Sequence, residues 1–224
     1  MTRLAAIAVV TVALVVGGCA PKRVRQPPES SGFLDDYSLL RAGGPGQVRL
    51  VYLNPDADWP TYQKVLLEPV TLWRSGKNSL GPVPEEDLLR LVSYFQKSLR
   101  DRLGADYQLV DAPAPGVMRI RLGITEARVA VPILDVLAAR AAVDGGEQDA
   151  TPLHPEMRRF LEHADIEGEI RDAQSGVVLA QGVDSRRKDQ SAPPLNTWGD
   201  VDRALDGWVS RLCGRLEART GPAR

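Results

Sequence analysis

The stretch Met118-Arg119-Ile120-Arg121-Leu122-Gly123-Ile124-Thr125 sets the fold class of this chain. Its large apolar side chains fall at every second position, and arginine or threonine occupies positions between them. This alternation is typical of a strand that buries one side and exposes the other. The sequence therefore predicts a half-buried β-strand over residues 118–125, and hence a sheet with one covered face.

Other strands are predicted before this stretch. Residues 48–53 and 107–110 are short apolar runs bounded by turn residues. Residues 62–73 are also apolar, but Pro69 interrupts them. Because proline cannot donate to a sheet ladder, we expect either an edge strand or two short strands with a break.

A β-hairpin is predicted over residues 165–183. Ile166, Gly168 and Ile170 alternate with charged residues, and a turn ending at Gly176 leads into a second apolar run. We interpret the alternating charges of residues 165–171 as the solvent-exposed face of the hairpin.

Two long amphipathic helices are predicted. The first begins near Pro84, carries acidic residues in its first turn and is expected to end at Gly104. The second begins at Asn196-Thr197, with Asp200 three residues after Thr197, a spacing close to that of a capping box. Residues at helical spacing predict the buried face of each helix. They are Leu88, Leu91, Val92, Phe95, Leu99 and Leu103 in the first, and Trp198, Val201, Leu205, Trp208, Val209, Leu212 and Leu216 in the second.

The remaining segments give weaker patterns. Residues 33–40 could form a short helical turn, with Asp35 and Asp36 facing solvent or capping. Residues 129–143 are ambiguous, because Pro132 interrupts them and their Ala-rich part could be a helical arm. Residues 144–155 are predicted to be a loop or a disordered insertion, and 186–194 a loop. Together the elements predict an α+β fold: a mixed, mostly antiparallel sheet of about five to six strands, packed by two long helices.

The N-terminus has the pattern of a secretory signal. Arg3 is followed by an apolar run over residues 4–16, which is shorter than the roughly 20 residues needed to span a bilayer. The run ends in Val16-Gly17-Gly18-Cys19, which resembles the lipobox of bacterial lipoproteins. That resemblance implies cleavage between Gly18 and Cys19, and acylation of Cys19. An ordinary secretory signal with an incidental Cys19 is the alternative.

The leader also predicts a location. Ala20, rather than aspartate, follows Cys19, and by resemblance to enterobacterial lipoproteins this implies the outer membrane, with the domain facing the periplasm of a Gram-negative envelope. The Pro-rich residues 20–31 are expected to be a disordered tether reaching up to roughly 40 Å. The predicted organisation is a signal peptide over 1–18, a lipidated tether over 19–31, one domain over 32–219 and a tail over 220–224.

Composition restricts the classes of function. The 224 residues carry 28 Lys+Arg and 29 Asp+Glu, a formal net charge of −1, so there is no basic excess to suggest a nucleic-acid partner. Of the two cysteines, Cys19 is expected to carry lipid. Cys213 is then unpaired and is expected to be a small core residue.

Four groups of residues together resemble a family of bacterial lipoproteins known as domain of unknown function 3313. They are Ser31-Gly32-Phe33-Leu34 with Tyr37; Tyr62-Gln63-Lys64-Val65 with Glu68-Pro69-Val70; Glu167-Gly168-Glu169-Ile170-Arg171-Asp172 through Gly176; and Trp198-Gly199-Asp200-Val201 with Trp208. The resemblance implies a cell-envelope lipoprotein and transfers no activity and no site residue.

The sequence supports no catalytic or metal site. His154 and His163 lack neighbouring ligands at zinc spacing, and Ser79, Ser93 and Ser191 lack nucleophile-elbow glycines. We therefore expect that the protein is not an enzyme and uses no cofactor. It is instead expected to be a non-catalytic accessory module that binds an envelope protein and is held to the membrane through Cys19. A carrier of a lipid or glycan is the alternative, which an open apolar cavity would favour and a flat aromatic patch would not.

Overall fold

A computed structural model describes residues 30–74, 83–126, 131–132, 149–185 and 194–221 of the chain. The predicted signal peptide 1–18, Cys19 and most of the tether lie outside the described residues. So do most of the ambiguous segment 129–143 and of the loop 186–194.

The described residues form one mixed, mostly antiparallel sheet of nine strands, with the order β1-β2-β9-β8-β6-β3-β5. β4 pairs with β6 and β7 beside this path. The strands are β1 (Arg41–Ala42), β2 (Leu50–Leu53), β3 (Lys64–Leu67), β4 (Thr71–Arg74), β5 (Gln108–Leu109), β6 (Val117–Glu126), β7 (Val131–Pro132), β8 (Ala164–Asp172) and β9 (Val178–Ser185). The α+β prediction is confirmed, with more strands than the five to six expected.

Strand β6 is the longest in the described part of the chain and joins the two halves of the sheet. One side pairs antiparallel with β8, from Met118 opposite Asp172 to Glu126 opposite Ala164. The other side pairs in parallel first with β3 and then with β4. Residues 62–73 are thus two short strands with a break at Pro69, one of the two predicted arrangements.

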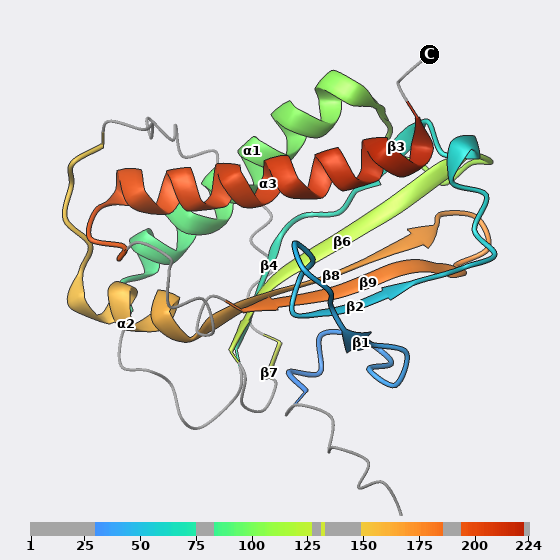
Figure 1. The fold of residues 1–224 in the computed structure, drawn as a ribbon. Coiled ribbons are helices and arrows are strands. Elements are labelled where there is room, and N and C mark those ends of the chain that lie inside the picture. The colour runs from blue at the N-terminus through green and yellow to red at the C-terminus, as the bar shows by residue number, and fades with distance from the viewer. Residues whose placement is uncertain (1–29, 75–82, 127–130, 133–148, 186–193, 222–224) are drawn as a thin grey trace, which may run out of the picture.

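Two long helices lie side by side over one face of the sheet, α1 (Glu85–Asp106) and α3 (Trp198–Thr220), as Figure 1 shows. A short helix, α2 (Pro155–His163), precedes β8, and a single 3-10 turn, η1 (Trp59–Thr61), follows β2. The sequence did not predict α2. None of the helices in the described ranges is apolar over a length that could cross a membrane.

The helix ends follow the sequence in part. Thr197 and Asp200 complete a full capping box at the start of α3, as predicted. Helix α1, however, continues through Gly104 to Asp106, where the Tyr107 N–H donates to the Leu103 carbonyl. Gly104 is therefore a residue of the last turn rather than its terminator, because Leu103 and Tyr107 both remain buried and keep that turn in place.

The main core lies between the two long helices and the sheet. Phe95, Leu99 and Leu103 of α1 are fully buried there, and Cys213 of α3 is a free, buried cysteine. The predicted apolar faces of both helices are confirmed. Trp208 and Leu212 are the members of the α3 face that remain partly exposed.

A second, smaller core lies on the opposite face of the sheet. It is made by the N-terminal segment, residues 31–40, which crosses under β2, β9 and β8 (Figure 1). Phe33, Leu34 and Leu40 of this segment pack against Val183 of β9. The predicted helical turn over 33–40 is wrong: the segment is a series of bends and turns, because its side chains follow the surface of the sheet.

The prediction that the charged face of β8 is exposed to solvent is also wrong. Asp165, Glu167 and Glu169 are 2 to 3 % exposed. The N-terminal segment and neighbouring arginines cover this face, so the charged residues alternate with the apolar ones without reaching solvent. Both faces of β8 are therefore covered, one by helices and the other by a polar layer.

Candidate functional site

An apolar cavity opens between α3 and the part of the sheet formed by β2, β9, β8 and β6. We call it the β2 cavity; its volume is about 110 Å³. Its floor comes from the helix-facing side of the strands, with Val51 and Leu53 of β2 at one margin. Its other main lining residues are Trp59, Ile120, Leu122, Ile166, Gly168, Ile170, Ala180, Gly182, Trp208, Leu212 and Leu216.

A second cavity of about 200 Å³ lies further along α3, toward α2. We call it the α2 cavity. It is lined mainly by Leu91, Ile124, Leu161, Ala164, Leu195, Val201, Ala204 and Leu205. Ile166, Asp184 and Trp208 line both cavities. The two are therefore neighbours along the same helix, with these three residues between them.

Small residues make the space beneath α3. Gly168 of β8 and Gly182 of β9 stand directly opposite each other in the sheet, so no side chain rises from the floor at that point. A Cβ built on Gly168 would lie 2.4 Å from Cδ2 of Leu122, which leans over the glycine. Ala180 and Ala204 add further short side chains to the lining.

Trp208 is held in place at the junction of the two cavities. Its Nε1–H donates to Oδ2 of Asp184 at 3.0 Å. Its ring also meets Phe95 of α1 edge to face, with centroids 5.5 Å apart. Because the indole is fixed by both contacts, it forms a stable wall between the cavities.

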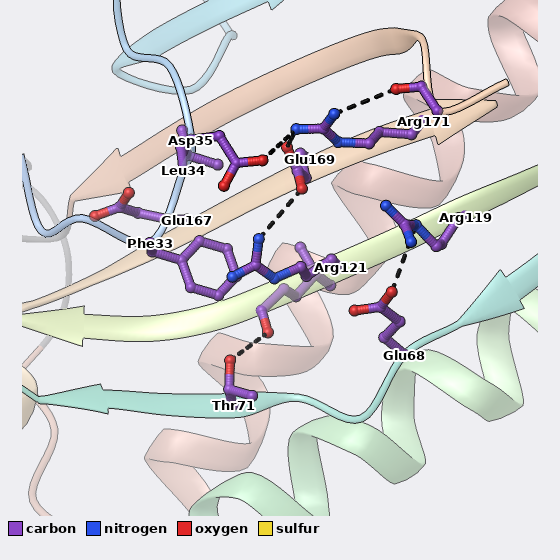
Figure 2. A network of polar contacts seen from close by, with 12 residues as sticks. Phe33, Leu34, Asp35, Glu68, Thr71, Arg119, Arg121, Glu167, Glu169 and Arg171 are labelled. Atoms are coloured by element: carbon purple, nitrogen blue, oxygen red, sulfur yellow. Dashed lines mark hydrogen bonds and ion pairs between the residues drawn. The ribbon is translucent and has the colours of Figure 1, made fainter. Parts of the chain in front are cut away.

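The opposite face of the sheet carries a polar layer centred on Glu167 and Glu169 of β8 (Figure 2). Glu169 accepts from Arg171 at 2.9 Å and Arg121 at 3.3 Å. Arg171 also pairs with Asp35 of the N-terminal segment at 2.8 Å. Each carboxylate of this layer is thus already bound to donors, which gives the layer a structural role.

Glu167 joins the N-terminal segment to the sheet. Its carboxylate accepts from Tyr37 Oη at 2.6 Å and from Thr125 Oγ1 at 2.8 Å. Burial, together with the hydrogen bond to Glu167, raises the pKa of Tyr37 to about 12. Burial also acts to raise the pKa of Glu169, but the bond and charge of Arg171, with Arg121, hold it below its usual value. Tyr37 and Glu169 therefore keep one protonation state near neutral pH.

The residues singled out in the sequence do not form a common site. Gly18 and Cys19 lie outside the described residues, as do Ser79 and Ser191. His154 caps α2 by accepting from Glu156 N–H, and His163 bonds the Arg159 carbonyl at the other end of that helix. Within the described ranges no three His, Cys, Asp or Glu side chains gather as metal ligands.

The structure also shows the positions of several other residues singled out in the sequence. Burial raises the pKa of the Cys213 thiol to about 11, which fits its predicted core role. Asp36 caps its own turn by accepting from Ser38 N–H. Trp198 is 3 % exposed, as predicted, whereas Trp208 is only partly buried because it borders the cavities.

The cavity residues are not apparent from the sequence. Val51, Ala180 and Leu212 look like ordinary core positions in a strand or helix pattern. The available signal was the pair Gly168 and Gly182, since glycine within a strand often marks a place where another group approaches the backbone.

The chain matches one protein family and has a distant structural similarity to solved proteins. A family described as "Protein of unknown function (DUF3313)" matches residues 29–212. No curated protein is significantly similar to this chain.

Among solved structures, a PelC variant dodecamer from Paraburkholderia phytofirmans is 12% identical, with a TM-score of 0.33 over 75% of this chain and 95% of that chain. A second crystal form of the PelC dodecamer from that organism is also 12% identical, with a TM-score of 0.30 over 74% of this chain and 94% of that chain.

Proposed function

Because the chain belongs to the DUF3313 family, whose description assigns no activity, we propose a function from its own geometry: a non-catalytic accessory protein of the cell envelope that binds the apolar part of a lipid-like ligand beneath α3. The observation that carries the proposal is the β2 cavity, an apolar space that opens between a helix and a sheet. Such spaces are common sites for small ligands.

The size of the two cavities fits a narrow apolar group. A dry cavity of about 150 Å³ lined by Leu, Ile and Phe is enough to bind benzene. The β2 and α2 cavities, at about 110 and 200 Å³, bracket that value. Each can hold a short length of one acyl chain, and the two lie next to each other along α3 with Trp208 between them.

The surface of the described residues gives less support to a module that binds its partner through an aromatic patch. Among these residues, Val177 is the one large hydrophobic side chain that is exposed, at 51%. An interface core normally gathers several aromatic or aliphatic anchors. A ligand inside the fold therefore accounts for the structure better than a protein docked on such a patch.

The proposal includes the membrane anchor predicted from the leader. The lipobox-like Val16-Gly17-Gly18-Cys19 supports acylation of Cys19 and a periplasm-facing domain at the outer membrane. More than one acyl chain is needed for stable anchoring. The N-terminal segment that leads back toward this anchor lies on the face of the sheet opposite the cavities (Figure 1).

Binding of an uncharged fluorescent probe tests the cavity. N-phenyl-1-naphthylamine should brighten on addition of the purified domain, and its emission should be excited through Trp208 and Trp59, which line the β2 cavity. Val51→Phe should abolish most of this signal, because the larger ring fills the space beside β2.

Val177→Phe is the matched control, since it places the same ring on an exposed position outside the cavity. Thermal unfolding of both variants verifies that they fold. If the wild-type protein does not bind the probe, or if Val51→Phe binds it as well as Val177→Phe does, the proposed function is wrong.

A further inference from the structure

We infer that the ligand of the β2 cavity is a single-chain amphiphile with an anionic head group, held by Arg215 and Arg219 at the mouth of the cavity. This inference rests on the proposed function and specifies its ligand. The cavity binds the apolar chain of the ligand, and the arginines bind its head group.

The two arginines lie beside the apolar wall of the cavity. Leu212 and Leu216 form that wall, and Arg215 and Arg219 come three residues after them on α3, so the arginines form a second row beside the leucines. One turn of helix separates them, a rise of about 6 Å. Arg211 continues the row by one more turn and lines the α2 cavity. Positive charge thus runs along the apolar space.

Both arginines are partly buried and their side chains are held in place. The Arg215 guanidinium donates to the backbone carbonyl of Gly46 in the turn before β2. The Arg219 guanidinium lies 5.9 Å from the ring centroid of Trp59, within the range of a cation–π contact. Neither contact neutralises the charge, so both guanidiniums can still bind an anion.

No carboxylate of the described residues pairs with Arg211, Arg215 or Arg219. This contrasts with the polar layer on the other face, where Arg121 and Arg171 are bound to Glu169. Two carboxylates line the β2 cavity, and both are already bound: Asp184 by Trp208, and Glu169 by Arg121 and Arg171. Glu217 of α3 is exposed and does not line either cavity.

A row of unpaired arginines beside an apolar cavity is complementary to a molecule with a tail and a negative head. Guanidinium groups bind carboxylate and phosphate through two parallel hydrogen bonds, and these are stronger than bonds between neutral groups. The volumes given above suit one chain rather than two. A free cation or an uncharged chain would leave the arginines without a partner.

Competition with the uncharged probe tests the inference. Dodecanoate, dodecanol and dodecyltrimethylammonium share one chain and differ in head-group charge. We expect dodecanoate to displace N-phenyl-1-naphthylamine at a concentration at least tenfold lower than dodecanol requires, and the cationic amphiphile to be the weakest. Each measurement stays below the micelle concentration.

Variants of the arginines show whether they cause this preference. Arg215→Gln and Arg219→Gln should each lower the preference for dodecanoate over dodecanol about tenfold, measured with the same variant. Arg215→Lys, which keeps the charge, should retain most of the preference. Arg100→Gln is the matched control, because Arg100 is exposed on α1 and lines neither cavity.

The outcomes separate this inference from the proposed function. If the uncharged probe binds but dodecanoate and dodecanol displace it equally, the cavity binds apolar ligands and the anionic head group is wrong. The same holds if both Gln variants keep the wild-type preference for dodecanoate. If no probe binds at all, both proposals fail together.

Discussion

At the scale of single residues, Asp202 of α3 is the least satisfied charged group among the described residues. It is 1% exposed, and neither carboxylate oxygen has a hydrogen-bond donor. Burial raises its pKa from 3.8 to about 6, against the lowering effect of Arg90 on α1. Asp149, in the loop before α2, and Asp206, one turn further along α3, both add to the rise.

We predict that Asp202→Asn stabilises the protein above pH 6. A pKa raised in the folded state contributes stability that is present below about pH 4 and is lost as the pH rises through 6. The wild-type protein therefore pays a penalty near pH 8 that an uncharged side chain avoids. Each pKa unit corresponds to about 1.4 kcal/mol, so we expect a gain of about 1–3 kcal/mol at pH 8 and little gain at pH 4.

Urea unfolding at the two pH values measures this difference. Asp206→Asn is the matched control, because Asp206 already accepts from Tyr94 Oη at 2.9 Å and Ser98 Oγ at 2.6 Å. That variant should lose stability at pH 8. If Asp202→Asn changes the free energy of unfolding by the same amount at pH 4 and at pH 8, the predicted effect of the Asp202 charge is wrong.

Phe95 is the second residue for which we predict a clear effect. It is fully buried between α1 and the sheet and contacts the Trp208 ring. Phe95→Ala should lower the free energy of unfolding by about 3–5 kcal/mol, because it leaves a cavity at a site with no exposure. A loss below about 1 kcal/mol in urea would show that the core closes around the gap.

At the scale of elements, the N-terminal segment 31–40 works as part of the domain although it contains neither helix nor strand. Phe33 meets Trp73 edge to face at 5.9 Å, and the Arg121 guanidinium lies 4.3 Å from the Phe33 ring centroid. Gly123 of β6 makes room for that ring, since a Cβ there would lie 2.5 Å from it. The segment is thus fitted to the sheet at particular positions.

We predict that Tyr37→Phe destabilises the protein by about 1–3 kcal/mol, because buried Glu167 loses the hydroxyl donor at 2.6 Å. Tyr52→Phe is the matched control: Tyr52 packs against the same small core, and its hydroxyl has no hydrogen bond to a described residue. Thermal unfolding compares the two. Equal melting temperatures for both variants would mean that the Tyr37–Glu167 bond contributes nothing.

The same segment explains why the sequence predicted some elements and misjudged others. Strand β6, the hairpin and the start of α3 follow from local patterns, and all were predicted. The exposure of Glu167 was misjudged because its partner Tyr37 is 130 residues away in the chain. Alternation shows that two faces differ, but it does not show what covers each of them.

At the scale of the whole molecule, we predict that the mature protein begins at an acylated Cys19. The short apolar leader and its Gly18-Cys19 ending are the reason. Intact-mass spectrometry of protein extracted from membranes should show a diacylglyceryl group and a further acyl chain. Cys19→Ser should leave the unprocessed leader in place, and an unmodified wild-type N-terminus at another residue would contradict the prediction.

The α+β architecture could be predicted from the sequence, but the candidate site could not. The apolar faces of α1 and α3 showed that both helices pack on the sheet. The cavities depend on how closely α3 approaches β2 and β9, a distance set by packing between segments far apart in the chain. Glycines at 168 and 182 were visible, yet their opposition across β8 and β9 appears only once the register is known.

The attachment of the N-terminal segment also has a mechanical consequence. A pulling force applied to the chain before Ser31 reaches Phe33, Asp35 and Tyr37 before it reaches any strand. These side chains contact β6 and β8 in the middle of the sheet, through Arg121, Arg171 and Glu167. The load therefore passes to the two longest strands of the described residues before it reaches the two-residue edge strand β1.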